Sequence, residues 1–416
     1  MKQKIAVTLL SAALALSAAL PLSGCTTANA TDLMSGITPT AVSLDPDLVK
    51  DSAAVTDFAV KLFQNSLNEE GNTLISPLSV LSALAMTANG AKGETLSQME
   101  DVLGLPREQL NAYLHTYMTQ LPQGDKSSLN LANSIWFRDD EGLTVEQEFL
   151  QTNADFYGAD LYKAPFNSAT CKEINAWVKK NTDGLIDGIL DQIPENAMLY
   201  LINALAFDAE WANIYTDGSV KTRTFTKENG RTQDVELMYA GEHLYLEDEH
   251  ATGFIKYYDG YGYAFAALLP NEGISVADYV STLTGEHLNL LLSNPVSVEV
   301  DTAIPKFETA YTVDMSAVLQ DMGMTHAFDM FAADFSAMGS HPEGNLFINR
   351  VLHKAFITVD ERGTKAGAVT TVEAACGAAM PEEEPKRVIL DRPFVYLLID
   401  CETNLPFFLG TVMDVH

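Results

Sequence analysis

The residues of this chain that could carry chemistry are not arranged in a familiar catalytic motif. The 416 residues contain no G-x-S-x-G nucleophile turn, no H-E-x-x-H zinc motif, no G-x-x-x-x-G-K-[ST] phosphate loop and no C-x-x-C redox pair. Eight histidines are scattered along the chain, and only His243 has a candidate metal ligand, Glu247, four residues further on. That pair lies in an acidic stretch more typical of a solvated strand end. We therefore expect no catalytic residue, no metal and no cofactor.

The composition of residues 360–394 is typical of a mobile segment that can insert into a sheet as a strand, rather than of an ordinary loop. Small and β-branched residues dominate its first half, and they suit a segment that must enter between existing strands, because charged or bulky side chains would lose water or clash. Proline, which would remove a ladder donor, is absent from residues 362–380. Apolar strands are expected at residues 356–359, 394–399 and 407–412. The segment is therefore predicted to be a long, exposed loop between core strands.

This segment resembles the hinge and reactive-centre loop of the serpin family. Serpins carry Glu-x-Gly-Thr followed by an alanine-rich run, and later an Arg-Pro-Phe or Lys-Pro-Phe turn. The matching residues here are Glu361, Gly363, Thr364, Ala366 and Ala368 in the hinge and Arg392, Pro393 and Phe394 in the turn. Lys365 departs from the family's usual Glu, although a strand period of two lets it point to water. Non-inhibitory serpins usually carry proline or bulky charges in the hinge, so this hinge favours an inhibitor.

A second similarity to serpins lies in residues that control where the central sheet parts. Ser76 is a predicted helix cap, and serines matching Ser76 and Ser79 lie beneath the sheet in the family. Residues 198–207 read as a buried strand that contains Asn203, and a lone buried asparagine is costly without a hydrogen-bonding partner. The resemblance supplies His353 as that partner. It places His353 with Ser76, Ser79 and Asn203 in a group of structural residues at the point of opening, called the shutter. His353 is therefore interpreted as a structural residue rather than a catalytic base.

Further elements follow in the order of the serpin family. Thr170 and Glu173 form a capping box that predicts a helix over residues 174–180. Apolar alternation predicts a half-buried strand at residues 296–304, and Asp314 is a predicted cap of the next helix. Helices and strands mix without regular alternation, which predicts an α+β class. The resemblance implies a serpin fold with three β-sheets, about eight or nine helices and an exposed reactive-centre loop.

The chain is expected to divide into a leader, a tether and one domain. Residues 1–24 have a basic start and a short apolar run, which is typical of a secretory signal. Leu22-Ser-Gly-Cys25 resembles a bacterial lipoprotein box, in which Cys25 becomes lipidated; a plain cleaved signal and an uncleaved anchor are the alternatives. Residues 25–50 read as a flexible tether, and residues 51–416 as the serpin domain, with its reactive-centre loop at about residues 361–392. These features predict a lipid-anchored protein on the outer face of a bacterial membrane.

The net charge limits which partners are expected, and the cysteine content limits which disulfides are expected. The formal net charge of −31 argues against nucleic acid, because phosphate binding needs clustered Lys and Arg. It suits a partner with a cationic surface, or it serves solubility alone. The four cysteines, Cys25, Cys171, Cys376 and Cys401, do not form an evenly spaced framework, so the fold is not expected to rely on disulfides. We expect a monomer.

The resemblance implies suicide inhibition of a target serine protease through a covalent acyl complex. In that mechanism the cleaved loop inserts into the central sheet and deforms the protease. Non-inhibitory binding at the cell surface and inhibition of a cysteine protease are the alternatives. A thiol at Cys376 in the loop also raises redox control of target recognition, against the simpler interpretation of a residue chosen for its small size.

The bond to be cleaved is expected near Gly377–Ala378, sixteen residues beyond Glu361 by the family's usual spacing. The distance to Pro393 is about five residues longer than is common, so Cys376 and Ala379 are alternatives. Small apolar residues in this stretch favour an elastase-like protease. Lys386 and Arg387 would suit a trypsin-like enzyme, but cleavage there would leave an overlong strand with three glutamates to insert.

Overall fold

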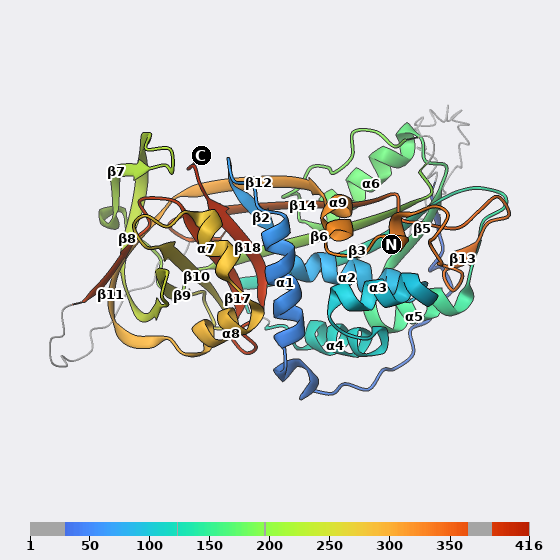
Figure 1. Ribbon diagram of the computed structural model, residues 1–416, viewed down its shortest axis with the longest axis horizontal. Helices are drawn as coiled ribbons and strands as arrows, with labels where there is room; N and C mark the ends of the chain where they lie inside the picture. Colours follow the sequence, from blue (N-terminus) through green and yellow to red (C-terminus); the bar gives the residue numbers. More distant parts are fainter. Residues whose placement is uncertain (1–29, 123, 195–196, 365–384, 416) are drawn as a thin grey trace, which may run out of the picture.

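The computed structural model describes residues 30–122, 124–194, 197–364 and 385–415, in which helices pack around two large β-sheets (Figure 1). The described α-helices are α1 (Ala53–Asn65), α2 (Pro77–Ala88), α3 (Gly93–Leu103), α4 (Arg107–Gln120), α5 (Gln147–Tyr157), α6 (Ser168–Asn181), α7 (Val276–Thr282), α8 (Gly285–Ser293) and α9 (Met315–Asp321). Short 3-10 turns are η1 (Leu48–Lys50), η2 (Asp217–Ser219) and η3 (His326–Phe328). These nine helices and three sheets of the described chain confirm the predicted α+β class.

The first sheet has seven strands in the order β1-β5-β3-β6-β15-β14-β12. Their bounds are β1 (Thr31–Asp32), β3 (Ser127–Arg138), β5 (Asp160–Ala164), β6 (Leu199–Glu210), β12 (Phe307–Asp314), β14 (Arg350–Val359) and β15 (Gly363–Thr364). Its two faces are covered by different helices, because side chains alternate along a strand. Leu199 and Leu201 of β6 join the main core with α2, whereas Tyr200 and Ile202 join a second core with α6.

The second sheet follows the path β16-β11-β8-β9-β10-β17-β18-β2, with β7 beside β8. Its strands are β2 (Thr73–Ile75), β7 (Val220–Thr226), β8 (Thr232–Glu247), β9 (Ala251–Tyr257), β10 (Tyr263–Pro270), β11 (Val296–Pro305), β16 (Lys386–Ile389), β17 (Phe394–Asp400) and β18 (Pro406–Val412). A third sheet pairs β4 (Thr144–Val145) with β13 (Gly339–Ser340). The apolar strands β17 and β18 are buried along their whole length, as predicted from their composition.

Local capping explains where several helices begin. The Ser76 hydroxyl accepts a hydrogen bond from the Ser79 amide at 3.4 Å, and Pro77 occupies the first turn of α2, where no amide hydrogen is needed. The Asp314 carboxylate likewise accepts from the Ser316 amide at 3.0 Å at the start of α9. Both caps confirm the predictions made from the sequence.

The predicted capping box of α6 is wrong. The helix begins at Ser168, and the Asn167 side chain accepts hydrogen bonds from the amides of Ala169, at 2.8 Å, and Thr170, at 3.1 Å. Asn167 adopts an extended backbone, with φ −112° and ψ −171°, which leaves its side chain free to reach these donors. Thr170 is instead a buried residue within the first turn.

The expectation that all of residues 25–50 form a flexible tether is also wrong. Strand β1 pairs antiparallel with β5, with Thr31 opposite Lys163 and Asp32 opposite Tyr162. Further along, the backbone amide and hydroxyl of Thr40 both donate to the Asp155 carboxylate of α5, each at 2.7 Å. An unpaired sheet edge offers backbone groups to any extended segment, which explains why a polar stretch without periodicity becomes ordered here.

The described part of the chain holds two free cysteines, Cys171 and Cys401. Within the same residues, no helix is both long enough and apolar enough to cross a membrane. No group of His, Cys, Asp and Glu side chains in these ranges has an arrangement able to hold a metal ion.

Candidate functional site

The seven-stranded sheet, which is the central sheet of the molecule, parts between β6 and β14. The two strands pair in parallel only where Arg350–Leu352 lies opposite Tyr200–Ile202. Beyond that point no ladder in the described chain joins residues 203–208 of β6 to residues 353–358 of β14. Backbone donors and acceptors along this gap face a site that one additional strand would fill.

A short hinge strand already occupies the far end of this gap. Strand β15 pairs antiparallel with β6, with Gly363 opposite Glu210 and Thr364 opposite Ala209, and Thr364 also lies opposite Val359 of β14. A Cβ atom on Gly363 would lie 1.9 Å from the carbonyl oxygen of Ala209, so only glycine permits this approach. The predicted hinge residues Gly363 and Thr364 are thus placed as the first residues of a strand between β6 and β14.

Thr364 is held inside the protein. Its side chain is 1% exposed, and its hydroxyl is hydrogen-bonded to the Tyr258 hydroxyl. The Tyr258 ring stacks on Trp211, with centroids 4.4 Å apart and planes inclined by 9°. The Trp211 backbone amide in turn donates to the carbonyl oxygen of Arg362 at 2.7 Å, and its indole donates to the carbonyl oxygen of Asp360 at 2.9 Å. Aromatic packing and backbone hydrogen bonds therefore hold Thr364, the last described residue of the hinge strand, in the sheet.

Two ion-pair networks flank the hinge strand. Glu361 binds Lys306, which also contacts Glu236 at 3.0 Å. Burial, the largest single influence, raises the pKa of Glu361, but the hydrogen bond and charge of Lys306 together with a backbone hydrogen bond outweigh it and leave the pKa below its usual value. On the other side, Glu210 of β6 binds both Arg362, at 3.3 Å, and Lys126, at 2.9 Å.

In the second network, the carboxylate of Glu210 is ionised at neutral pH. The Lys126 hydrogen bond is the main cause that lowers the pKa of Glu210, with a smaller contribution from Arg362. Both pairs are partly exposed, so they orient the hinge more than they stabilise the fold.

The shutter residues lie on the α2 side of the sheet, beneath the point of parting. The Ser76 backbone amide donates to His353 Nε2 at 3.1 Å, which links the start of α2 to β14. Ser76, Ser79 and His353 are all buried, at 2% exposure or less. Burial lowers the pKa of His353 to about 4, so the imidazole is neutral and can accept this hydrogen bond. The structure thus brings these three predicted residues together.

The predicted pairing of Asn203 with His353 is wrong in this structure. The Asn203 amide instead donates to Asn133 Oδ1, and His353 Nε2 is taken by Ser76. The reason lies in the register: Asn133 of β3 is directly opposite Asn203 in the antiparallel ladder, whereas β14 separates from β6 one residue earlier, after Leu352. Asn133 was missed at the sequence level, although an asparagine in the middle of a strand is the same signal that identified Asn203.

Several predicted residues lie outside the described residues. These are the hinge residues Ala366 and Ala368, the candidate bond residues Cys376, Gly377, Ala378 and Ala379, and the lipidation candidate Cys25. The described chain resumes before β16, in which Lys386 and Arg387 pair in parallel with Val300 and Asp301 of β11.

The sequence reasoning also missed the partners that hold the hinge. Lys306, Glu210, Trp211 and Tyr258 come from separate regions of the chain, and the sequence pattern gave no sign that they meet. The assembled arrangement lacks a nucleophile and base in hydrogen-bonding contact. What it offers is a strand-shaped gap with the start of a strand anchored at one end.

Comparison with known proteins places this arrangement in a family. Residues 53–415 match the family model described as Serpin (serine protease inhibitor). An uncharacterized serpin-like protein of Thermococcus kodakarensis is 31% identical over 369 residues, which are 87% of this chain and 85% of that protein. The leukocyte elastase inhibitor of Bos taurus is 30% identical over 380 residues, covering 86% and 98% of the two chains.

Solved structures agree with the fold and with the state of the sheet. The crystal structure of the thermophilic serpin tengpin in its native state superimposes with a TM-score of 0.88, at 47% identity, over 93% of this chain and all of that one. The latent state of tengpin gives a TM-score of 0.79, at 44% identity, over 91% of this chain and all of that one. The higher similarity to the native form agrees with a gap that only β15 enters in the described residues. By sequence, by fold and by the parted sheet, the chain belongs to the serpin family.

Proposed function

We propose that this serpin is a suicide inhibitor of serine proteases that traps its target by inserting the cleaved loop between β6 and β14. The observation that carries the proposal is strand β15: Thr364 already pairs with both walls of the gap and Gly363 with β6, so the hinge can extend without first finding its register. Small residues at Ala366 and Ala368 suit the continuation of that strand. Non-inhibitory serpins usually lack such a hinge.

The energy available from insertion is adequate for trapping. About fifteen new ladder bonds at roughly 1 kcal/mol each supply on the order of 15 kcal/mol. A deacylation near 10 per second must slow by about a millionfold to last for days, which requires roughly 8 kcal/mol. Loss of one oxyanion donor accounts for only about 10² to 10³ of that factor. Insertion must therefore distort more of the protease than its oxyanion hole.

The test is a gel assay for a covalent complex that resists SDS. Wild-type protein is expected to form this complex with an elastase, whereas Thr364→Arg and Ala366→Pro are expected to be cleaved without complex. An arginine at position 364 would have to be buried beside Tyr258, and a proline at position 366 would interrupt the new ladder. Thr222→Arg, on the exposed strand β7, is the matched control and should trap normally.

Two outcomes would contradict the proposal. Full trapping by both hinge variants would show that insertion is not required. Binding of partners without any cleavage or covalent complex, by a correctly folded wild type, would instead favour a cell-surface binding protein.

We propose an elastase-like target with small apolar specificity and cleavage at Gly377–Ala378, or within Cys376 to Ala379. Support comes from the small residues of this stretch and from a similar protein named leukocyte elastase inhibitor. Intact mass of the C-terminal fragment released by elastase locates the bond. A stable complex with trypsin, together with a fragment that begins at Val388, would overturn both the site and the target class. A complex with a papain-like protease alone would favour a cysteine protease target.

We also propose that Cys25 is lipidated and anchors the protein to the outer face of a bacterial membrane. The proposal depends on the Leu22-Ser-Gly-Cys25 sequence after an apolar run. Stable anchoring requires more than one acyl chain, and Cys25→Ala removes the residue that would carry these chains. The variant should therefore move from the membrane fraction to the soluble fraction. Unchanged fractionation would contradict lipidation.

A further inference from the structure

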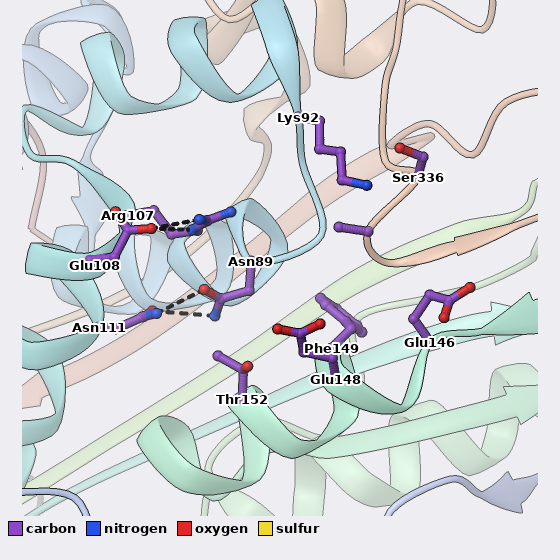
Figure 2. A pocket seen from close by; sticks show the side chains of 11 residues that line it. Asn89, Lys92, Arg107, Glu108, Asn111, Glu146, Glu148, Phe149, Thr152 and Ser336 are labelled. Carbon is purple, nitrogen blue, oxygen red and sulfur yellow. Dashed lines mark hydrogen bonds and ion pairs between the residues drawn. The ribbon is translucent and has the colours of Figure 1, made fainter.

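A polar pocket of about 640 Å³ opens between α4, α5 and the connection from α2 to α3 (Figure 2). None of its lining residues belongs to the hinge or to the strands that part. Its volume is within the range of small-molecule sites. The charges of its lining residues therefore decide which ligand it would recognise.

The two walls of the pocket carry charges of opposite sign. Lys92, between α2 and α3, and Arg107, at the start of α4, line one wall, whereas Glu146 and Glu148, at the start of α5, line the other (Figure 2). Arg107 is neutralised by Glu108, at 2.5 Å. No ion pair within 4.0 Å joins Lys92 to a carboxylate in the described part of the chain. One positive and two negative groups are thus left to face the pocket.

A pair of hydrogen-bonded amides, buried Asn111 and half-buried Asn89, forms a fixed floor. The Asn111 amide donates to Asn89 Oδ1 at 2.8 Å, and the Asn89 amide donates back to Asn111 Oδ1 at 3.2 Å. The Tyr157 hydroxyl also donates to Asn111 Oδ1, at 2.6 Å, and Asn111 is only 5% exposed. Each amide keeps one hydrogen that is not used in this exchange, so the floor can donate to a ligand without rearranging.

Backbone hydrogen bonds hold the walls at a fixed separation. The Glu146 amide donates to the Met338 carbonyl oxygen at 2.9 Å, and the Met338 amide donates to Gly90 at 3.1 Å. The Lys92 amide donates to the carbonyl oxygen of Asp334, also at 2.9 Å. The loop that contains Met338 therefore ties the start of α5 to the connection that carries Lys92. A site held in this way loses little free energy to ordering when a ligand binds.

From this charge pattern we infer that the pocket binds a small basic zwitterion with one carboxylate and two cationic groups, such as a basic amino acid or a basic dipeptide. The ligand carboxylate pairs with Lys92, and its two cationic groups face Glu146 and Glu148. A ligand of this charge neutralises the pocket, whereas a simple anion or a simple cation leaves charges of the walls unpaired.

Titration calorimetry of the purified protein with four probes tests the charge requirement. L-arginine and glycyl-L-arginine carry all three charged groups, agmatine lacks the carboxylate, and citrulline lacks the side-chain cation. We expect both complete probes to bind at least 10-fold more tightly than agmatine or citrulline. Equal affinity for L-arginine and either incomplete probe, or no binding at millimolar concentration, would overturn the inference.

Variants then assign the charges to residues. Lys92→Gln should weaken L-arginine at least 10-fold and should not weaken agmatine, because agmatine has no carboxylate to pair with Lys92. Glu148→Gln should weaken both L-arginine and agmatine, because each carries two cationic groups for the two carboxylates. These side chains are exposed, so the variants should fold, and Lys172→Gln on the exposed face of α6 is the control that should bind as the wild type does. Uniform behaviour of all variants would show that binding occurs elsewhere and would overturn the site.

Discussion

At the scale of single residues, His353 couples protonation to a backbone contact in the shutter. Its imidazole is neutral because burial lowers the pKa to about 4, against an ordinary value near 6.5. Between these two values the unfolded chain binds a proton that the native state does not, so stability falls as pH falls through this window. Since one unit of pKa is worth about 1.4 kcal/mol, His353 alone contributes about 3 kcal/mol at neutral pH that is lost near pH 4.

Unfolding midpoints measured between pH 7.5 and pH 4 test this prediction. His353→Gln should flatten the dependence on pH above about 4, whereas His243→Gln, on the surface, should leave it unchanged. Carboxylates with lowered pKa values, such as Glu210 and Glu361, lose their contribution to stability at lower pH than His353 does. They therefore do not mimic the effect of His353 on the unfolding midpoint. An unchanged slope in His353→Gln would contradict the assignment.

Gly363 provides a second prediction at this scale. An alanine Cβ there would lie 1.9 Å from the Ala209 carbonyl oxygen and 2.8 Å from the Glu210 Cα, and backbone atoms of a paired strand cannot move aside as a side chain can. Gly363→Ala should therefore release β15 from β6, with faster hydrogen exchange of the peptide that contains Thr364 and a lower unfolding midpoint. Gly344→Ala, where a Cβ meets nothing within 4 Å, is the control. Equal exchange in the two variants would show that β15 does not depend on this contact.

The residues also show what the sequence could predict. Ser76 and Asp314 were correct because a cap depends on neighbours a few residues away. The partner of Asn203 was wrong because it depends on the register between β3 and β6 and on where β14 leaves β6, which are set by tertiary pairing. The hinge motif identified Gly363 and Thr364, whereas Lys306 and Tyr258 meet them only once the chain has folded.

At the scale of elements, a substitution can test whether α6 is capped by Asn167, as in the structure, rather than by the capping box of Thr170 and Glu173 that the sequence predicted. Asn167→Ala should lower stability by about 1 kcal/mol, because the amides of Ala169 and Thr170 would lose their acceptor. Thermal unfolding of Asn167→Ala beside Asn167→Asp, which keeps an acceptor, measures the cap. If Asn167→Ala is as stable as Asn167→Asp, the capping role of Asn167 is wrong.

At the scale of the whole molecule, the net charge of −31 predicts that salt slows the reaction with a cationic protease. The association rate with a basic elastase should fall by roughly tenfold between about 0.05 M and 0.5 M sodium chloride, because the Debye length shortens from above 10 Å to below 5 Å. The rate with an acidic protease should rise or stay constant over the same range. Equal salt dependence for both enzymes would show that the charge serves solubility alone.

The overall fold could be predicted because family motifs are spread along the chain, from Ser76 near its start to Pro393 near its end. The N-terminal segment could not be predicted, since its contacts come from the edge of a sheet formed by other residues. Its polar composition is common to tethers and to added edge strands. The difference lies in Asp155 and β5, which supply its partners.

Strand β1 determines how an anchored molecule would stand on its membrane. Thr31 is so close in sequence to Cys25 that the chain between them spans at most about 20 Å. Tyr162, opposite Asp32, pairs with Trp136 of β3, whereas the hinge lies level with Ser127, about 30 Å further along that strand. If Cys25 is lipidated as proposed, the hinge strand β15 lies at the end of the sheet that is away from the bilayer. If the cleaved loop also inserts between β6 and β14 as proposed, it would carry a captured protease down the sheet toward the lipid surface, and the membrane itself would limit where the trapped enzyme can come to rest.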